Sequence, residues 1–412
     1  MAASVIIIGA GQAGFQVAAS LREKGFDGTV TLIGAERHGP YQRPPLSKAY
    51  LAQPVLPVVD IRPATFYRDK AIDLLIGKRA VAIERDRREV RLDSGETLRY
   101  DHLVFATGGR NRRLGMAGED LEGVLSLRDL DDAEHLRGRM REAKQMVIVG
   151  GGYIGLEVGS YALALGIPTT IIEAASRLCA RVASKDLSEF FERHYREAGT
   201  DIRFDTTLAA IDGRDGRVDS VRLSTGETLP ASLLLVCVGI LPNVELAEAC
   251  GLKTANGITV DRFLRTSDPH IYAIGDSARF PSRHAAGESV RVESVANASD
   301  QGRTVAEAIL GHAKPFENLP WFWSEQGKLK LQIAGWTQGH DRTVVKGDTA
   351  TGLFSVFCFR GQTLAGVECM NRPTDFVAAR RAMTEGIVLG PDEVASPAFD
   401  FKSRLGPLRA PV

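Results

Sequence analysis

Short runs of consecutive apolar residues, each ending at or just before a glycine, recur through the first 310 residues of the chain. Four of them lie at 5–8, 103–106, 146–149 and 233–238. Runs without polar alternation are typical of strands that are buried on both faces of a parallel sheet. Segments of helical length separate the strands. This alternation predicts an α/β protein with doubly wound parallel sheets.

The strand pattern is part of an internal duplication. The stretch VIIIGAGQAG at 5–14 is echoed by MVIVGGGYIG at 146–155, and SGETL at 94–98 is echoed by TGETL at 225–229. The later pairs keep one offset, because 131 residues separate Gly95 from Gly226 and also Gly108 from Gly239. Each copy therefore predicts a buried strand, a glycine-rich turn, a helix, a second strand, a hairpin and a closing strand.

The pattern changes beyond about residue 317. Strand-like runs follow at 330–334, 343–345 and 353–359, and a helical pattern runs from 374 to 383. These segments predict a C-terminal α+β domain with an antiparallel sheet. The expected fold is thus two Rossmann-like dinucleotide-binding domains of the glutathione-reductase type plus this third domain.

Both glycine-rich turns fit the dinucleotide-binding motif G-x-G-x-x-G, because each follows an apolar strand and opens a helix. The first glycine permits a tight turn, the second lets a pyrophosphate approach the backbone, and the third lets the helix pack against the strand. The phosphates then meet the positive end of the helix. The candidate residues are Gly9, Gly11 and Gly14 in the first copy, and Gly150, Gly152, Tyr153, Ile154 and Gly155 in the second.

A carboxylate about 20 residues beyond such a turn accepts hydrogen bonds from a ribose. Glu36 follows the second strand of the first copy, and Glu173 directly follows the second strand of the other copy. A carboxylate at this place also repels a 2′-phosphate, so Glu173 predicts NADH rather than NADPH. Arg177 is close enough in sequence to leave this preference open.

The stretch IYAIGD at 271–276 assigns the first copy to FAD. A strand that ends in Gly-Asp places the Asp276 carboxylate where it can bind the ribitol hydroxyls of a flavin, and NAD has no ribitol. With Ala106-Thr107-Gly108, the chain resembles the flavoprotein reductases that bind two dinucleotides. The FAD domain is then discontinuous, at 1–112 and 241–316, around an NAD domain at 113–240 and before a C-terminal domain at 317–412.

A narrower resemblance rests on PYQRPPLSK at 40–48, GILPN at 239–243, VESVAN at 292–297, DQG at 300–302 and WFWSEQ at 321–326. These motifs are similar, in content and order, to those of the NADH-dependent reductases that supply small 2Fe-2S ferredoxins. Gln42 and Gly327 depart from the pattern, where relatives often have aspartate and an aromatic residue. We expect these departures to affect the choice of partner more than the flavin chemistry.

The resemblance implies roles for individual residues. Lys48 is expected near flavin N5, where a cation stabilises the charge that arrives with a hydride, and Glu157 is expected to face the nicotinamide. Trp323 is expected near the isoalloxazine, although packing in a core is the more usual role of a tryptophan. Arg43 and Arg128 are expected on the FAD phosphates or ring, although a loop contact or a solvated charge would also explain them. The remaining candidate cofactor-binding residues are Val81, Ala106, Thr107, Gly108, Val295 and Gly239.

Composition narrows the class of protein. The 51 basic residues balance the 51 acidic residues, so nothing indicates nonspecific binding to nucleic acid or to an anionic membrane. No leader sequence or membrane span is evident, which favours a cytoplasmic enzyme. The five cysteines are scattered and never spaced as a C-x-x-C pair, so neither a disulfide scaffold nor a metal site is expected.

The mechanism expected from these features is a relay in which NADH reduces noncovalent FAD, and the flavin passes single electrons to a 2Fe-2S ferredoxin that serves a monooxygenase or a ring-hydroxylating dioxygenase. The ferredoxin is expected to be acidic and to dock on a local basic patch of Arg303, Lys328 and Lys330. An NADH oxidase, peroxidase or disulfide reductase would need a thiolate beside the flavin, and no cysteine precedes Cys179. A redox-responsive interaction protein like apoptosis-inducing factor would be expected to have a targeting segment and a basic surface.

Overall fold

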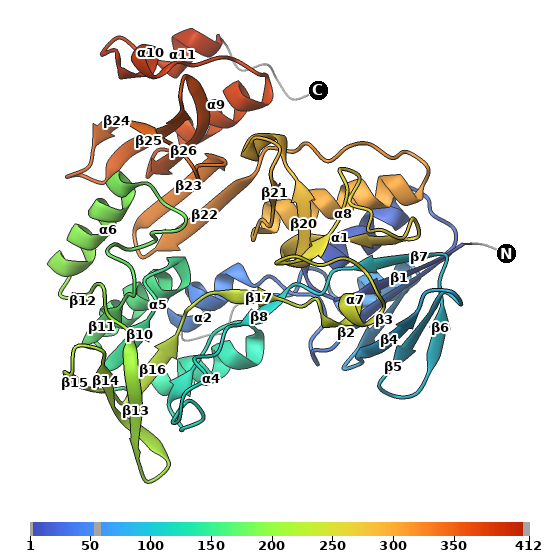
Figure 1. Ribbon diagram of the computed structural model, residues 1–412, viewed down its shortest axis with the longest axis horizontal. Coiled ribbons are helices and arrows are strands. Elements are labelled where there is room, and N and C mark those ends of the chain that lie inside the picture. Colours follow the sequence, from blue (N-terminus) through green and yellow to red (C-terminus); the bar gives the residue numbers. More distant parts are fainter. Residues whose placement is uncertain (1–2, 53–58, 407–412) are drawn as a thin grey trace. The chain divides into compact units, whose positions relative to one another are not determined.

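The computed structural model describes residues 3–52 and 59–406. The chain divides into two compact units (Figure 1). Unit 1 consists of Met1–Gln42, Val58–Arg110 and Ile240–Pro320, and unit 2 consists of Arg43–Pro57, Asn111–Gly239 and Trp321–Val412. Within the described ranges, every helix is too short or too polar to span a bilayer.

Unit 1 is built on a five-stranded parallel sheet in the order β19-β7-β1-β2-β3. Its strands are β1 (Ser4–Ile8), β2 (Thr29–Gly34), β3 (Ile72–Ile76), β7 (His102–Phe105) and β19 (Ile271–Ala273). Helix α1 (Gln12–Glu23) packs closely on α8 (Val295–Ile309), because a Cβ on Gly302 would lie 2.8 Å from the Cβ of Gln16. The first half of the predicted duplication therefore has the expected parallel sheet.

The remaining elements of unit 1 are short. An antiparallel sheet carries the SGETL turn between its last two strands, β5 and β6. The sheet consists of β4 (Ala80–Glu84), β5 (Glu89–Leu92) and β6 (Thr97–Arg99). The other strands are β8 (Gly109–Asn111), β17 (Ile240–Pro242), β18 (Ile258–Thr259), β20 (Ala278–Pro281) and β21 (Ser289–Val290), and the short helices are α3 (Ala64–Asp69), α7 (Glu245–Ala249), η2 (Gly275–Ser277) and η3 (Arg283–Ala285).

Unit 2 repeats this plan with a parallel sheet in the order β12-β11-β10-β16-β9. Its strands are β9 (Val124–Leu125), β10 (Met146–Val149), β11 (Thr169–Ile172), β12 (Asp201–Arg203) and β16 (Leu233–Val236). An antiparallel sheet follows with β13 (Leu208–Arg214), β14 (Arg217–Leu223) and β15 (Thr228–Pro230), and the helices are η1 (Pro44–Ser47), α2 (Ala49–Ala52), α4 (Leu130–Met140), α5 (Tyr153–Ala164) and α6 (Lys185–Glu197). The TGETL turn lies between β14 and β15, as the repeat predicts.

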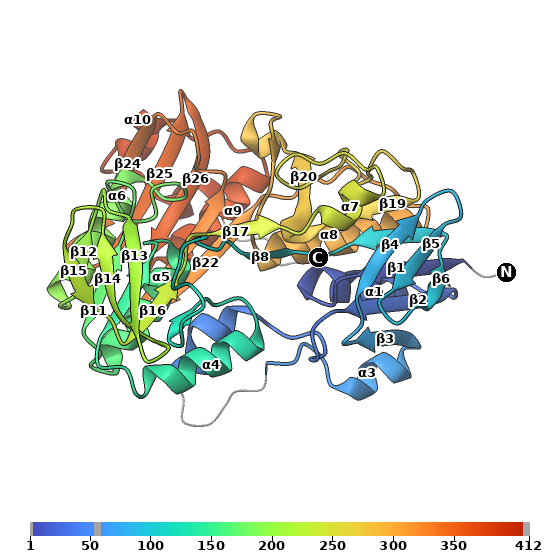
Figure 2. The same cartoon turned by 60° about the horizontal axis from the view of Figure 1, so that its bottom comes forward.

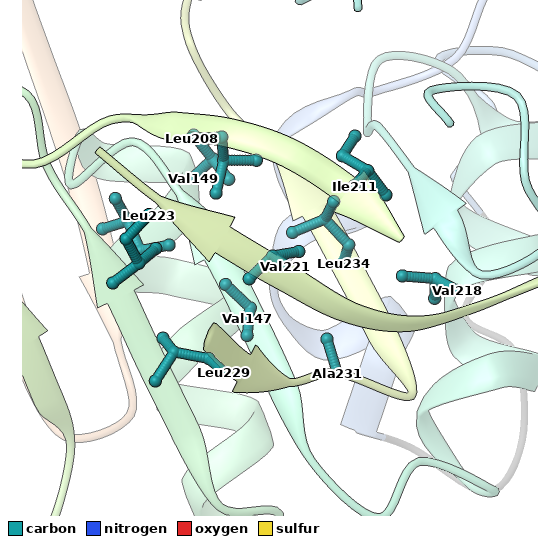
Figure 3. Close-up of a cluster of buried hydrophobic side chains, with 11 residues drawn as sticks. Val147, Val149, Leu208, Ile211, Val218, Val221, Leu223, Leu229, Ala231 and Leu234 are labelled. Carbon is teal, nitrogen blue, oxygen red and sulfur yellow. The ribbon is translucent and has the colours of Figure 1, made fainter. Parts of the chain in front are cut away.

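A buried apolar cluster joins the two sheets of this repeat (Figure 3). Val147 and Val149 of the parallel strand β10 contribute to it, together with Val221 and Leu229 of the antiparallel strands. Val147 and Val221 have no exposed surface. Burying such side chains is favourable by about 1.5–3 kcal/mol each, so the hairpin is firmly attached beside the strand that leads into the glycine-rich turn.

The C-terminal part of unit 2 is a five-stranded antiparallel sheet in the order β22-β23-β26-β25-β24. Its strands are β22 (Trp321–Gln326), β23 (Leu329–Gly335), β24 (Arg342–Asp348), β25 (Leu353–Arg360) and β26 (Thr363–Met370). Helices α9 (Pro373–Thr384), α10 (Pro391–Ala395) and α11 (Phe401–Leu405) follow, and α9 packs on β23 and β26. Figure 2 shows α9 beside β26. The antiparallel class is as predicted, whereas the sequence pattern does not predict strands β22 and β26. The boundaries of the three predicted domains stay a prediction.

Candidate functional site

The first glycine-rich turn has the shape of a phosphate cradle. Gly9 has φ +116°, and a Cβ there would collide with the carbonyl oxygen of Ala106. A Cβ on Gly14 would collide with the carbonyl oxygen of Gly9, whereas a Cβ on Gly11 would have no neighbour within 4 Å. The first and third glycines are therefore required by packing, and the second borders open space where a ligand can approach.

The second turn repeats these features. Gly150 has φ +105°, and a Cβ there would collide with the carbonyl oxygen of Cys237. A Cβ on Gly155 would collide with the carbonyl oxygen of Gly150, while Gly152 is open. Gly11 and Gly152 are the N-cap residues of α1 and α5, and neither helix has a side-chain cap. Their first backbone N–H groups are left for an anion, which fits the diphosphate of a dinucleotide.

Glu173 lies at the carboxyl end of β11 and faces the second cradle. One carboxylate oxygen accepts a hydrogen bond from the N–H of Gly151 at 2.8 Å, and the other accepts from the N–H of Ala175 at 2.8 Å. An ionised carboxylate has about four acceptor positions, so Glu173 keeps capacity for ribose hydroxyls. Its place beside the turn fits the role that its sequence position predicts.

The Arg177 side chain forms hydrogen bonds with the loop that contains it. Its guanidinium donates to the carbonyl oxygens of Ala180 and Ala183, at 2.8 and 2.9 Å, and to Oγ of Ser188 at 2.6 Å. A guanidinium held in this way supports the loop that follows Glu173. Both terminal nitrogens of Arg177 donate within this loop, which favours the NADH preference predicted from Glu173.

The first cradle, the Ala106-Thr107-Gly108 loop and the Gly275-Asp276 turn, all assigned to FAD, lie in unit 1. The other residues expected at the flavin lie in unit 2 and are Arg43, Lys48, Arg128 and Trp323. Gly275 has φ +69°, and its N–H donates to Oε1 of Gln301 at 2.7 Å. Gln301 is fully buried, and its Nε2 has no hydrogen-bond partner among the described residues. The turn before Asp276 is thus fixed by α8. This glutamine belongs to the DQG motif at 300–302, but the sequence alone indicates no role for it.

The Ala106-Thr107-Gly108 loop is fixed by a reciprocal pair of hydrogen bonds. Oγ of Thr107 donates to the carbonyl oxygen of Asn243 at 2.8 Å, and Nδ2 of Asn243 donates to the carbonyl oxygen of Thr107 at 2.9 Å. Glu36, at the end of β2, accepts a hydrogen bond from the hydroxyl of Tyr41. These hydrogen bonds hold the segments beside the first glycine-rich turn in place. The residues around this turn fit FAD.

Lys48 and Glu157 form a buried ion pair in unit 2. The Nζ of Lys48 lies 2.7 Å from Oε2 of Glu157, and these residues are 8 % and 1 % exposed. The hydroxyl of Ser47 donates to the same oxygen, and that of Ser324 donates to Oε1 at 2.6 Å. Three separate segments, η1, α5 and β22, thus converge on one carboxylate. The structure brings Lys48 and Glu157 together and adds two serines that sequence reasoning missed.

The other residues with predicted roles are distributed over both units, and some of them are exposed. Arg43 donates to the carbonyl oxygen of Arg128 at 2.7 Å. Trp323 is partly exposed and stacks on Trp321 with ring centroids 5.5 Å apart. Val81 and Ile154 are exposed, at 45 % and 42 %. The ring of Tyr153 lies 4.8 Å from that of Phe322, Val295 begins α8, and Gly239 has φ +91°.

The three cations predicted to dock a partner differ in their surroundings. Arg303 forms an ion pair with Asp300 at 2.7 Å, one turn earlier on α8. Lys328 and Lys330 are exposed, at the turn between β22 and β23 and just after it. Part of the charge of Arg303 is therefore balanced locally.

Two glycine cradles on duplicated parallel sheets, each with a carboxylate after its second strand, define a reductase that binds two dinucleotides. The pyridine nucleotide-disulphide oxidoreductase model matches residues 3–302, and the reductase C-terminal model matches residues 321–405. The chain belongs to this oxidoreductase family, whose members use FAD and NAD(H). When bound, the flavin accepts a hydride and releases electrons singly.

Similarity to characterised relatives covers nearly the whole chain. Rhodocoxin reductase of Rhodococcus erythropolis is 45 % identical over 97 % of this chain and 93 % of its own. A crystal structure of a ferredoxin reductase from Rhodopseudomonas palustris has a TM-score of 0.95 at 46 % identity, covering 98 % of this chain and 100 % of its own. The covalent complex of putidaredoxin reductase with putidaredoxin gives a TM-score of 0.95 at 38 % identity, covering 98 % of each chain. Within its family, this chain is a member of the ferredoxin reductases.

Proposed function

We propose that this chain is an NADH:ferredoxin oxidoreductase that reduces a 2Fe-2S ferredoxin of an oxygenase system. The observation that carries the proposal is the pair of open glycine cradles, one with Glu173 and one beside the Gly275-Asp276 turn. Similarity to ferredoxin reductases over nearly the whole chain supports the choice of acceptor. The FAD domain is proposed at 1–112 and 241–316, the NAD domain at 113–240 and the C-terminal domain at 317–412.

The proposal gives each site residue a limited task. Asp276 holds the ribitol, and Glu173 holds the adenosine ribose of NADH. Lys48 supplies positive charge to the reduced flavin, and Glu157 fixes Lys48 while Ser47 and Ser324 satisfy the carboxylate. Trp323 packs on the flavin ring. The buried ion pair supports these roles, because a carboxylate with three donors is held in one position.

The direct test is electron transfer. The purified holoprotein should be reduced by NADH without oxygen and should then reduce an added 2Fe-2S ferredoxin, as read from the ferredoxin spectrum. Ferricyanide serves as an acceptor that needs no docking surface. If NADH reduces the flavin but no ferredoxin from a broad panel accepts electrons, the proposed acceptor class is wrong.

The alternative thiol chemistry finds no support in the cysteines. All five are free, and three of them are buried. Burial raises the pKa of Cys237 and of Cys369 to about 12, and it also raises the pKa of Cys179, Cys250 and Cys358. The thiolate is the nucleophile in disulfide and peroxide chemistry. An oxidase or disulfide reductase that depends on a cysteine is therefore disfavoured.

Replacing Asp276 by alanine should weaken FAD binding. A ribitol hydroxyl would lose its acceptor, at a cost of about 1–3 kcal/mol, which raises the dissociation constant roughly 5- to 150-fold. Fluorescence titration of the apoprotein with FAD measures the change. Asp86→Ala, at an exposed position of the same unit, is the control. Equal FAD affinity in the wild type and in Asp276→Ala would overturn the assignment.

The acceptor is proposed to be an acidic ferredoxin that is attracted by Arg303, Lys328 and Lys330. Replacing all three by glutamate should slow ferredoxin reduction but leave ferricyanide reduction unchanged. The wild-type rate with ferredoxin should fall with added salt, because the Debye length shortens from ~10 Å at 0.1 M to ~3 Å at 1 M. Steady-state rates over a range of ionic strength measure both effects.

A matched control separates docking from net charge. Lys70, Arg87 and Arg214 are also exposed, and their replacement by glutamate changes the charge by the same amount. This second triple variant should keep its rate with ferredoxin. An equal loss of ferredoxin reduction in both triple variants would reject the patch while leaving the assignments of FAD and NADH intact.

A further inference from the structure

The carboxylate of Glu368 is fully buried in the C-terminal sheet and is bound to Ser184. On β26, one of its oxygens accepts from the N–H of Ser184 at 2.9 Å, and the other accepts from the Ser184 hydroxyl. Ser184 is itself buried and is the N-cap of α6, with Oγ accepting from the N–H of Leu187 at 3.2 Å. A carboxylate 184 positions away in the sequence thus holds the start of α6.

Ser184 is also the end of the loop that begins at Glu173. In the middle of this loop, the N–H of Cys179 donates to the carbonyl oxygen of Gly151 at 2.9 Å. The hydroxyl of Tyr153 donates to the carbonyl oxygen of Val182 at 3.3 Å. The loop 173–184 therefore lies along the second glycine-rich turn. The start and the middle of this loop are bound to the glycine-rich turn, and the far end of the loop is bound to Glu368.

We propose that Glu368 is a positioning residue for NADH binding. It fixes the end of the loop 173–184, and the loop in turn holds Glu173 and the Gly151 turn in the geometry that a dinucleotide requires. The C-terminal domain thereby contributes to the affinity for NADH without contacting it. The inference rests on the proposed assignment of Glu173 to the adenosine ribose.

The surroundings of Glu368 argue against a role in packing alone. Its neighbours Val367, Cys369 and Met370 on β26 have no exposed surface. Burial raises the pKa of Glu368 to about 7, and Asp186 adds to this rise. An apolar residue would occupy the position at lower cost. The carboxylate has two donors, and both belong to Ser184, the residue that ends the loop.

The test compares two replacements of Glu368 in the FAD-loaded protein. Glu368→Leu removes both acceptors, and at pH 8, above the pKa of Glu368, we expect the dissociation constant of NAD⁺ to rise about tenfold, the size of one lost hydrogen bond to a charged group. Glu368→Gln should bind NAD⁺ within about twofold of the wild type, because its oxygen accepts from the N–H and its amide donates to the hydroxyl. Calorimetric titration of the oxidised holoprotein measures both.

A kinetic split distinguishes positioning from general damage. In Glu368→Leu, KM for NADH should rise, while kcat with ferricyanide and the FAD content should stay within about twofold of the wild type. Unchanged affinity for NAD⁺, or a fall in kcat without a rise in KM, would overturn the inference. If Glu368→Leu does not retain FAD, the NAD⁺ affinity of Ser184→Ala tests the inference instead. A threefold or larger rise in the NAD⁺ dissociation constant supports the inference, and no rise overturns it.

Thr343→Val is the matched control, because Oγ of Thr343 on β24 donates to Asp186 in the first turn of α6 at 2.9 Å. It removes another contact between the C-terminal sheet and the same helix, but this contact lies past the end of the loop. We expect no change in NAD⁺ affinity, and an effect equal to that of Glu368→Leu would overturn the inference. A wild-type protein that is not reduced by NADH would instead reject the proposed function.

Discussion

Replacing Glu173 by arginine is expected to raise KM for NADH by about 100-fold and to reverse the preference between NADH and NADPH. The variant loses the carboxylate that accepts from Gly151 and Ala175, and the ribose loses its acceptor. Hydrogen bonds to a charged group contribute about 1.5–3 kcal/mol, or roughly 10- to 150-fold in affinity. An arginine can also bind a 2′-phosphate through two parallel hydrogen bonds. Steady-state kinetics with both cofactors and ferricyanide measure the ratio.

Two further variants serve as comparisons for Glu173→Arg. Glu173→Gln keeps an acceptor oxygen without the charge, so it should lose less affinity for NADH than Glu173→Arg does. Arg177→Lys should weaken NADH binding without improving the use of NADPH, because the Arg177 guanidinium supports the loop through Ala180, Ala183 and Ser188. Equal use of the two cofactors by the wild type would show that the Glu173 carboxylate does not set the preference.

The glycine-rich turns and the parallel strands could be predicted, because each depends on a short local sequence pattern. The glycines of both cradles were identifiable because packing excludes a Cβ at the first and third positions, as Gly9 and Gly14 show. The parallel strands were identifiable because they are continuous apolar runs. Strand β22 was not predicted, since its WFWSEQ run has no clear alternation. Strand β26 was not predicted either, because Gly366 and Glu368 interrupt its apolar run.

The contacts around Glu157 and the contact between Glu368 and Ser184 could be found only in the folded structure. Ser47 and Glu157 lie 110 positions apart, and Ser324 and Glu157 lie 167 apart, so no local pattern connects them. A serine in sequence is most simply a solvated or capping residue. Glu368 resembles an exposed position in a strand, and its burial follows only from the pairing of β26 with both β23 and β25.

Replacing Glu368 by glutamine should stabilise the protein above neutral pH. The folded protein holds a proton on this carboxyl up to its pKa of about 7, whereas the unfolded chain releases it near the ordinary value of 4.5. The folded state therefore binds more protons between these two values, and stability is lost as the pH rises through this range. From pH 5 to pH 8 the wild type should lose about 2–3 kcal/mol relative to Glu368→Gln.

Thermal unfolding of the holoprotein at several pH values measures this difference. The melting temperature of Glu368→Gln should gain roughly 2–4 °C on the wild type between pH 5 and pH 8. Glu325→Gln, at an exposed position of β22 in the same sheet, should give a curve parallel to that of the wild type. Parallel curves for the wild type and Glu368→Gln would mean that the buried carboxyl does not change its protonation in this range. The raised pKa would then be rejected, while the hydrogen bonds to Ser184 would still account for a polar residue at this buried position of the sheet.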